Sequence, residues 1–269
     1  MKVKQELLPI TQIRGTFFNV DVDERHFIKA DDALHIISIE DMVYHGSHYT
    51  LDYDLFTQKT ASPLEIGGED VVTAYIPQLV EIAPAEMAAK YNISILDIRH
   101  RTDFDLAVDV ELFHQRDQGQ LPEMKVLGAD YMVDMERSQL YHRKNVIPLS
   151  GFKPDFRHEG MLSAYLNKHT HQLVRIDPLT IKEMPGEEVV KVLIPGRTQL
   201  DPYYRAKSIG TDLKTYLMRH PLTRHLEAKI IPLNETNLNR YVKINQEKET
   251  QRKATEQLRI WHRKFRNSV

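Results

Sequence analysis

The chain contains no cysteine among its 269 residues. Disulfide bonds, thiolate metal sites and a cysteine nucleophile are therefore excluded. Long apolar runs are also absent, because no stretch approaches the roughly 18 apolar residues that a membrane helix needs. Residues 1–13 lack the apolar core of a signal peptide, since Gln5, Glu6 and Pro9 interrupt them. We therefore expect a cytoplasmic protein that does not contact membranes.

An excess of charge of one sign is also absent. The chain has 36 Lys and Arg against 38 Asp and Glu, a formal net charge of −2. The whole molecule therefore has no strong electrostatic attraction to nucleic acid, and any such attraction must come from a local patch. Hydrophobic residues make up 41% of the chain, which is enough for a core.

Motifs of common nucleotide-binding and hydrolytic sites are missing. Gly67-Gly68 has neither the GxGxxG nor the GxxxxGK[ST] spacing, and the chain has no HExxH, no GxSxG, no EF-hand loop and no protein-kinase pattern. We therefore predict no catalytic residues and no cofactor, and we favour a protein that is not an enzyme.

The chain does contain an internal repeat. Residues 8–27 resemble residues 121–140, residues 68–88 resemble residues 186–206, and Arg99-His100 recurs as Arg219-His220. These three matches occur in the same order and lie 113, 118 and 120 positions apart. They predict a tandem duplication with units at 1–118 and 119–236, followed by a separate segment at 237–269.

Each unit is predicted to be mostly β with one or two short helices, so the fold class is α+β. Alternating and β-branched runs predict strands at 16–23, 34–39, 49–57, 71–76 and 106–110, and at 130–141, 146–149, 161–176, 189–194 and 226–231. Helices are expected to begin at Pro84 and Pro202, because proline favours the first helical position, and Asp201 is a suitable N-cap. A second short helix is expected at 212–220.

The C-terminal segment differs from both units. Helix formers dominate after Asn237, and Ile244, Gln251, Leu258 and Phe265 follow a spacing of seven. The segment holds nine Lys and Arg but three Glu, so it carries +6 while the rest of the chain carries −8. This pattern predicts a basic amphipathic C-terminal helix.

Two sets of side chains are candidates for binding. Aromatic and arginine side chains are favoured at protein interfaces, and basic side chains contact phosphate. The partner-binding candidates are Leu258, Trp261, Phe265, Tyr203, Tyr204 and Arg205; the nucleic-acid candidates are Arg252, Lys253, Arg259, Arg263, Lys264 and Arg266, together with the two Arg-His segments. The structural alternative is that these side chains pack on their own domain.

Histidine and carboxylate pairs are weaker candidates. His45 with His48, and His169 with His171, have side chains that can hold a metal ion. We favour instead the outer face of a hairpin for the first pair and a turn at 167–170 for the second, and we predict no metal site. The acidic pairs Asp21/Asp23 and Asp134/Glu136 recur in both units, which favours a role in a turn over acid/base catalysis.

The leading hypothesis is a non-enzymatic interaction or assembly protein. It would dock a protein partner, or a second copy, through the C-terminal helix and the surfaces of the repeated units, and both units should stay folded without 237–269. The alternative is a nucleic-acid-binding protein that uses the basic tail. A third hypothesis is an enzyme with a histidine/carboxylate site between the units.

Overall fold

The structure is a computed structural model that describes residues 8–62, 64, 66–143 and 145–266, and the side chains of its last helix as far as Trp261. About 32% of the residues are helical and about 30% lie in strands of several sheets, which confirms a mixed α and β protein. Within the described residues no helix is both long enough and apolar enough to span a bilayer.

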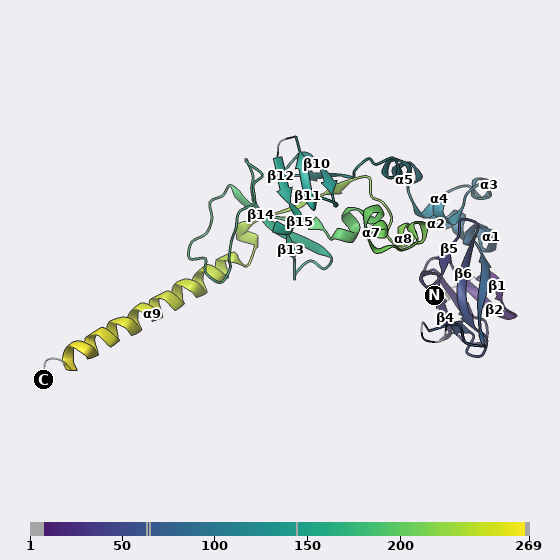
Figure 1. Cartoon of the computed structure of the whole chain (residues 1–269), viewed down its shortest axis with the longest axis horizontal. Helices are drawn as coiled ribbons and strands as arrows, with labels where there is room; N and C mark the ends of the chain where they lie inside the picture. Colours follow the sequence, from purple (N-terminus) through teal and green to yellow (C-terminus); the bar gives the residue numbers. More distant parts are fainter. Residues whose placement is uncertain (1–7, 63, 65, 144, 267–269) are drawn as a thin grey trace, which may run out of the picture. The chain divides into compact units, whose positions relative to one another are not determined.

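The chain divides into two compact units. Unit 1 consists of Met1–Gln120 and Pro202–Thr223, and unit 2 consists of Leu121–Asp201 and Arg224–Val269 (Figure 1). The segment Pro202–Thr223 therefore packs with unit 1, although it lies within the second repeat. The boundaries at 118 and 236 were predicted from sequence matches, whereas these two units are defined by packing. The predicted boundaries therefore stay a prediction.

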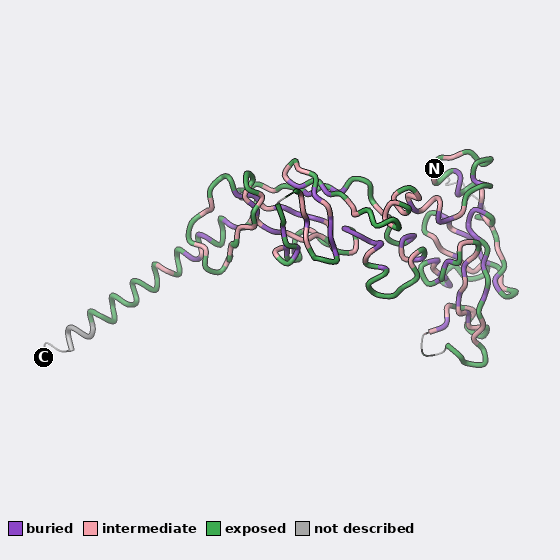
Figure 2. Tube along the Cα trace, turned by 45° about the horizontal axis from the view of Figure 1, so that its top comes forward, coloured by how far each residue is buried: buried purple, intermediate pink, exposed green. Residues whose placement is uncertain are grey.

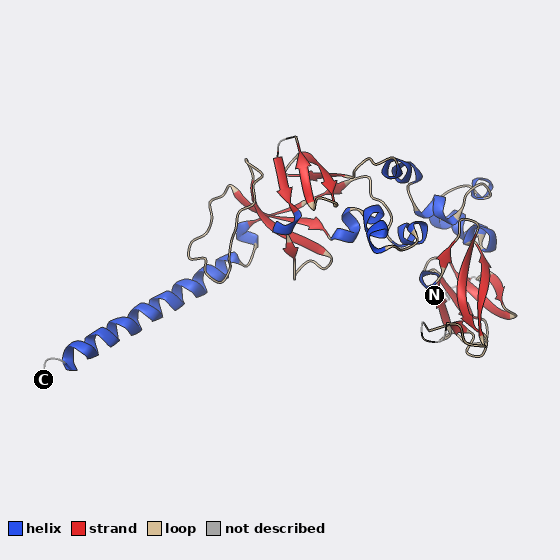
Figure 3. Ribbon diagram, viewed as in Figure 1, coloured by secondary structure: helices blue, strands red, loops and turns tan. Residues whose placement is uncertain are grey.

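Unit 1 contains two antiparallel sheets (Figure 3). One has the order β1-β2-β3-β4; in the other, β6 pairs with β5 and β7 on one edge and with β8 on the other. The strands are β1 (Ile10–Ile13), β2 (Thr16–Asp21), β3 (His26–Lys29), β4 (Ile36–Ser38), β5 (Val43–Tyr44), β6 (His48–Asp54), β7 (Lys59–Thr60) and β8 (Val71–Pro77), with the 3-10 helix η1 (Ile39–Asp41) between β4 and β5.

The helices of unit 1 come from both of its segments. They are α1 (Leu79–Ile82), α2 (Pro84–Tyr91), α3 (Ile95–Ile98), α4 (Asp103–Ala107), α5 (Val110–Asp117), α7 (Pro202–Ile209) and α8 (Leu213–Arg219). Tyr203, Leu217 and Met218 belong to the same buried cluster as Phe18 and Tyr53. The backbone N–H of Tyr44 also donates to Thr215 Oγ1 at 2.9 Å. Helices α7 and α8 are thus part of the core of unit 1.

Unit 2 has two sheets with the orders β12-β11-β10-β9-β16 and β13-β14-β15-β17. Its elements are β9 (Glu123–Val126), β10 (Ala129–Asp134), β11 (Gln139–His142), β12 (Asn145–Pro148), η2 (Leu149–Gly151), β13 (Lys153–Pro154), β14 (Met161–Asn167), β15 (Val189–Pro195), α6 (Arg197–Leu200), β16 (Leu226–Glu227), β17 (Lys229–Pro232), η3 (Leu233–Glu235) and α9 (Leu238–Arg266). The neighbouring strands β16 and β17 pair with β9 and β15, so residues 226–232 join the two sheets.

The same local chemistry forms the first hairpin of each unit. Two-residue loops connect β1 to β2 and β9 to β10, and both end in a glycine with positive φ, Gly15 and Gly128. Such tight hairpin loops need left-handed backbone, which glycine adopts without steric penalty. The next turn is held by Asp21 Oδ1 and Asp134 Oδ1, which accept from Glu24 N and Arg137 N at 2.9 Å. The recurring aspartates therefore stabilise turns.

Most predicted strands are present, but the prediction for 106–110 is wrong. This region lies in α4 and α5, and unit 1 holds more helix than predicted. Thr102 and Asp105 form a capping box, and Asp109 Oδ1 accepts from Leu112 N at 3.1 Å. These caps satisfy the N–H groups at both helix starts and favour helix over strand. The matched region of the second repeat has Leu222 and His225 at the positions of Thr102 and Asp105, and it forms β16 and β17.

Candidate functional site

Helix α9 starts inside unit 2 and then becomes exposed. Leu238 and Val242 are buried, and Asn245 Nδ2 donates to the carbonyls of Pro178 and Ile181 at 3.0 and 2.9 Å. Figure 2 shows that the exposed colour then continues along the helix, and every described residue from 250 to 261 is exposed. The first three turns of α9 therefore belong to unit 2, and a cut at residue 236 would remove part of its core.

An ion-pair cluster marks the end of this anchored part. Glu249 contacts Lys182 Nζ at 2.6 Å and Lys253 Nζ at 3.0 Å. The hydrogen bonds from Lys182 and then Lys253 lower the pKa of Glu249 to about 2. Lys253, one of the predicted nucleic-acid contacts, is thus partly engaged by an acidic neighbour.

The remaining tail candidates differ in how far they are described. Leu258 and Trp261 are 59% and 55% exposed, and Arg252 and Arg259 are exposed as well. The side chains of Arg263, Lys264, Phe265 and Arg266 lie outside the described ones. The roles predicted for all of these residues stay predictions.

The predicted Tyr-Tyr-Arg cluster lies in α7 of unit 1. Tyr203 is 4% exposed, and its hydroxyl donates to Asp117 Oδ1 at 2.6 Å. Lys207 Nζ lies 4.3 Å from the centre of its ring. Tyr204 is half-buried and Arg205 is exposed. The Tyr203 ring therefore packs within unit 1, as the structural alternative proposed, and the partner-binding role of the cluster is untested.

The side chains of both histidine pairs contact neighbouring residues of their own units or lie exposed in a turn. The rings of His45 and His48 stack at 5.2 Å, and His45 Nε2 lies 2.8 Å from Thr50 Oγ1. His171 Nδ1 lies 2.8 Å from the Tyr131 hydroxyl, and His169 is exposed in the predicted turn. Within the part of the chain that the structure describes, no three His, Cys, Asp or Glu side chains gather as metal ligands would.

One of the two Arg-His segments has a structural role in unit 1. Arg219 donates to the carbonyl of Met42 at 3.1 Å, and the His220 ring lies 4.6 Å from that of Tyr216. His100 borders a shallow depression beside α3. The enzyme hypothesis for a site between the units stays a prediction.

A larger feature lies within unit 2 and was not predicted. A groove of about 1010 Å³ is bounded by loop 153–158, strands β14, β15 and β17, loop 173–178 and the segment 235–241 that leads into α9. Volumes of this order accommodate drug-sized ligands or part of a polymer. The groove is therefore the best-formed candidate binding site of unit 2.

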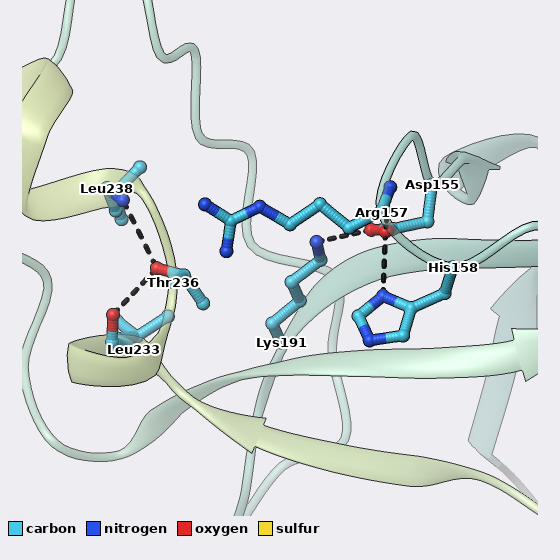
Figure 4. A network of polar contacts seen from close by, with 7 residues as sticks. All are labelled: Asp155, Arg157, His158, Lys191, Leu233, Thr236 and Leu238. Carbon is cyan, nitrogen blue, oxygen red and sulfur yellow. Dashed lines mark hydrogen bonds and ion pairs between the residues drawn. The ribbon is translucent and has the colours of Figure 1, made fainter.

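Asp155 is one of the residues that line this groove, and Figure 4 shows its polar contacts. Its side chain is 3% exposed and makes an ion pair with Lys191 Nζ, and Oδ1 lies 2.9 Å from His158 Nδ1. Burial by itself would raise the pKa of Asp155, but hydrogen bonds from Lys191, His158, the Arg157 N–H and Ser163 outweigh it and hold the pKa well below its usual range. Asp155 is therefore an ionised structural anchor.

This arrangement is unsuited to nucleophilic catalysis. In an activated Ser-His-Asp set the histidine lies between the hydroxyl and the carboxylate. Here the carboxylate of Asp155 lies in the middle, and Ser163 and His158 both contact it. A carboxylate with a lowered pKa is also a weak general base. The network therefore shapes the groove rather than supplying a reacting group.

No protein-family model, curated protein or solved structure matches this chain. The chemistry of the groove must therefore be inferred from its own side chains.

Basic side chains outnumber acidic ones along the groove. Five Lys and Arg line it against three acids. Of the acids, Asp155 is paired with Lys191, and Asp177 accepts from Leu179 N and Thr180 Oγ1 at 3.0 Å. Glu235 remains exposed. The groove therefore favours a negatively charged ligand.

Four of these basic side chains are exposed to solvent: Lys153, Arg157, Arg175 and Lys229. Their side chains make no hydrogen bond or ion pair with any residue that the structure describes. Figure 4 shows the Arg157 guanidinium pointing away from Asp155, towards the segment of Thr236. These charges are available to a ligand.

An exposed aromatic ring accompanies the cations. Phe156 is 103% exposed, and its turn is pinned because Asp155 Oδ1 accepts from Arg157 N at 3.0 Å. Tyr241, 38% exposed, lines the groove from the first turn of α9. The sequence held a signal for this site, because residues 154–160 form a polar, turn-rich segment with a phenylalanine in its middle. The polar residues around this phenylalanine offer no apolar core in which its ring could be buried.

Proposed function

We propose that this chain is a non-enzymatic interaction protein that docks an acidic partner chain on the distal part of α9, defined here as residues 250–261. The observation that carries the proposal is the exposure of this segment. Three large apolar side chains, Leu258, Ile260 and Trp261, are each about half exposed. Large exposed apolar groups clustered on one element are typical of interaction sites.

Helix stability supports the same conclusion. Isolated helices of this length are marginal in water, because most helical stability in proteins comes from packing an apolar face. The buried anchors Leu238, Val242 and Asn245 lie in the proximal part of α9, and residues 250–261 are exposed. A partner surface would supply the packing that unit 2 does not give to this segment.

Charge selects the partner. The distal part carries Arg252, Lys253 and Arg259 against Glu256. Two copies of this segment would repel each other, because both are basic, whereas an acidic partner would be attracted. Self-association, the other partner in our initial hypothesis, is therefore disfavoured.

We further propose that the two units arose by tandem duplication. The strands from β1 to β3 recur as β9 to β11 at a constant spacing of 113 residues, with the same pairing. Strands β6 and β8 form a seven-residue ladder that ends at a proline, as do β14 and β15. In this proposal the repeat provides two related scaffolds, and α9 is the added element that makes the contact.

The test uses the full chain with a photo-reactive amino acid at Ala254, which lies seven residues before Trp261. We expect a cross-link in the source cell to an acidic protein, and the purified partner should bind the chain directly. Trp261→Ala should weaken that binding about 30-fold or more, because buried interface tryptophans are typical hot spots. Truncation after Glu249, which keeps the buried anchors, should abolish it.

The matched control is Arg116→Ala in unit 1, which also removes one large side chain and should leave the affinity unchanged. Cross-linking to a second copy of the chain, to nucleic acid, or to nothing would contradict the proposal. A partner whose affinity is insensitive to Trp261→Ala would contradict it as well.

A further inference from the structure

We propose that the groove of unit 2 binds single-stranded nucleic acid. The inference goes beyond the docking role of α9 and rests on different residues. It depends on three properties of the groove: its cations, its aromatic rings and the hydrogen-bonded turn that carries Arg157 and Phe156.

The cations are arranged to follow a polyanion rather than to hold one small anion. Lys153 lies on β13 and Arg157 on the loop that follows it, Arg175 lies on a second loop, and Lys229 lies on β17. Side chains from three separate walls can each contact a different phosphate of an extended strand. Contacts of this kind supply most of the sequence-independent affinity of nucleic-acid-binding proteins.

The aromatic rings favour a single strand over a duplex. Phe156 and Tyr241 present exposed rings beside these cations. A base can stack on such a ring when it is unpaired, whereas bases in a duplex are already stacked on each other. The combination of a positively charged groove and exposed aromatic side chains is typical of single-strand binding.

The loop is held in place before any ligand arrives. The Asp155 carboxylate binds Lys191 of β15 and His158 and Arg157 N of its own turn, so the turn is tied to the sheet. Its neighbour Phe156 is thereby kept in solvent although it would gain by burial. A pre-formed turn loses little backbone conformational freedom on binding, which favours affinity.

An acidic peptide is the competing ligand class, since it would also be attracted by the cations. It would not need Phe156 to stack on a base. The contribution of that ring therefore separates the two ligands, and the salt dependence measures the phosphate contacts.

The experiment is fluorescence anisotropy of the full chain with labelled oligothymidylate and oligouridylate of about 20 nucleotides, long enough to exceed typical single-strand site sizes. A duplex of the same length and poly-L-glutamate serve as the competing probes. With about four phosphate contacts, affinity for the single strands should fall about 50-fold between about 50 and about 200 mM salt.

Two variants locate the site. Changing Lys153, Arg157, Arg175 and Lys229 together to alanine should flatten the salt dependence and nearly abolish binding. Phe156→Ala should weaken binding about 5-fold or more with the salt dependence unchanged, because it removes stacking and no charge. All five side chains are exposed, so both variants should keep the wild-type melting temperature.

The matched control changes Arg252, Lys253 and Arg259 of α9 to alanine. Binding that is lost in this variant but kept in the groove variant would overturn the inference while leaving the docking proposal intact. Tighter binding of the duplex or of poly-L-glutamate, or no binding to any probe, would also overturn it.

A spectroscopic readout tests stacking directly. The chain has one tryptophan, Trp261. Phe156→Trp in a Trp261→Phe background would place a single reporter in the groove. Its fluorescence should be quenched on addition of the single strand while affinity stays near that of the wild type. An unquenched reporter with full binding would place the strand elsewhere.

Discussion

Unit 1 and unit 2 each bury an aspartate, but the two carboxylates have opposite surroundings. Asp103 of unit 1 accepts from the Tyr49 hydroxyl and from Leu79 N and Val80 N, at 2.6 to 2.9 Å. Asp155 of unit 2 is paired with a lysine. The first carboxylate holds a helix start inside a closed core, whereas the second holds a loop at the edge of an open groove.

The pKa values follow from this difference. Burial raises the pKa of Asp103, although hydrogen bonds from Tyr49 and the two backbone N–H groups offset part of the effect. The hydrogen bonds from Lys191 and its neighbours outweigh burial at Asp155 and lower its pKa. The two units thus place the same residue type in a structural cap and in a candidate binding site.

The largest expected effect is the loss of stability of unit 2 when Lys191 is replaced. Lys191→Met should destabilise unit 2 by about 3–5 kcal/mol, because it removes the charged partner of the buried Asp155 carboxylate and leaves it only hydrogen bonds from its neighbours. Hydrogen exchange read by mass spectrometry should show the loss of protection in unit 2 and not in unit 1. Lys182→Met, which breaks an exposed ion pair, is the control and should leave the stability of unit 2 nearly unchanged. Equal effects of the two variants would show that the Asp155 network is not a stabilising anchor.

The second largest expected effect tests with which unit the segment 202–223 packs. Leu217 is fully buried in the core of unit 1. Leu217→Ala should cost about 2–5 kcal/mol through the cavity it leaves. Protection should be lost in residues 8–120, although Leu217 lies in the second repeat of the sequence. Leu200→Ala, buried in unit 2, is the matched control and should act on unit 2. Loss of protection in unit 2 for both variants would contradict the assignment.

The third effect concerns the helix that replaced a predicted strand. Thr102→Ala should weaken α4 by about 1 kcal/mol, because the side chain caps the N–H of Asp105. Urea unfolding measures it, and Thr102→Ser, which keeps the hydroxyl, should restore most of the loss. An unchanged midpoint for the alanine variant would show that the cap is not what favours helix here.

The same region shows where sequence reasoning succeeds and fails. The helix starts at Pro84 and Pro202 follow from local backbone preferences and agree with the prediction. The helices at 103–107 and 110–117 were missed because Leu106 and the apolar residues after it resemble the strand-forming residues 226–230, and the deciding signal was in the helix caps. The packing of α7 and α8 with unit 1 has no local signal, because it depends on contacts between residues that are 86 to 193 positions apart.

The groove was missed for a related reason. Asp155 and Lys191 are separated by 36 positions and meet because β13, which Asp155 follows, and β15 both pair with β14. Neither residue belongs to a motif. Phe156 was the one local clue, since an aromatic ring in a polar turn must either find a pocket or stay in water.

The smallest expected effect is a difference between Asp103 and Asp155 in how they make the stability of each unit depend on pH. A group whose folded pKa is lowered contributes stability above its unfolded pKa, so the contribution of Asp155 should disappear as the pH falls through about 4 and below. A raised folded pKa has the opposite sign: Asp103 binds its proton more tightly in the folded state, so unit 1 should gain stability as the pH falls towards about 4. Between about pH 6 and pH 3.5, protection from hydrogen exchange, corrected for the intrinsic exchange rate, should therefore fall in unit 2 and rise in unit 1. Asp103→Asn and Asp155→Asn should each remove the pH response of one unit and keep that of the other. If both units weaken together on acidification, and the asparagine variants behave alike, then the two carboxylates share one environment and the contrast between a structural cap and a groove anchor fails.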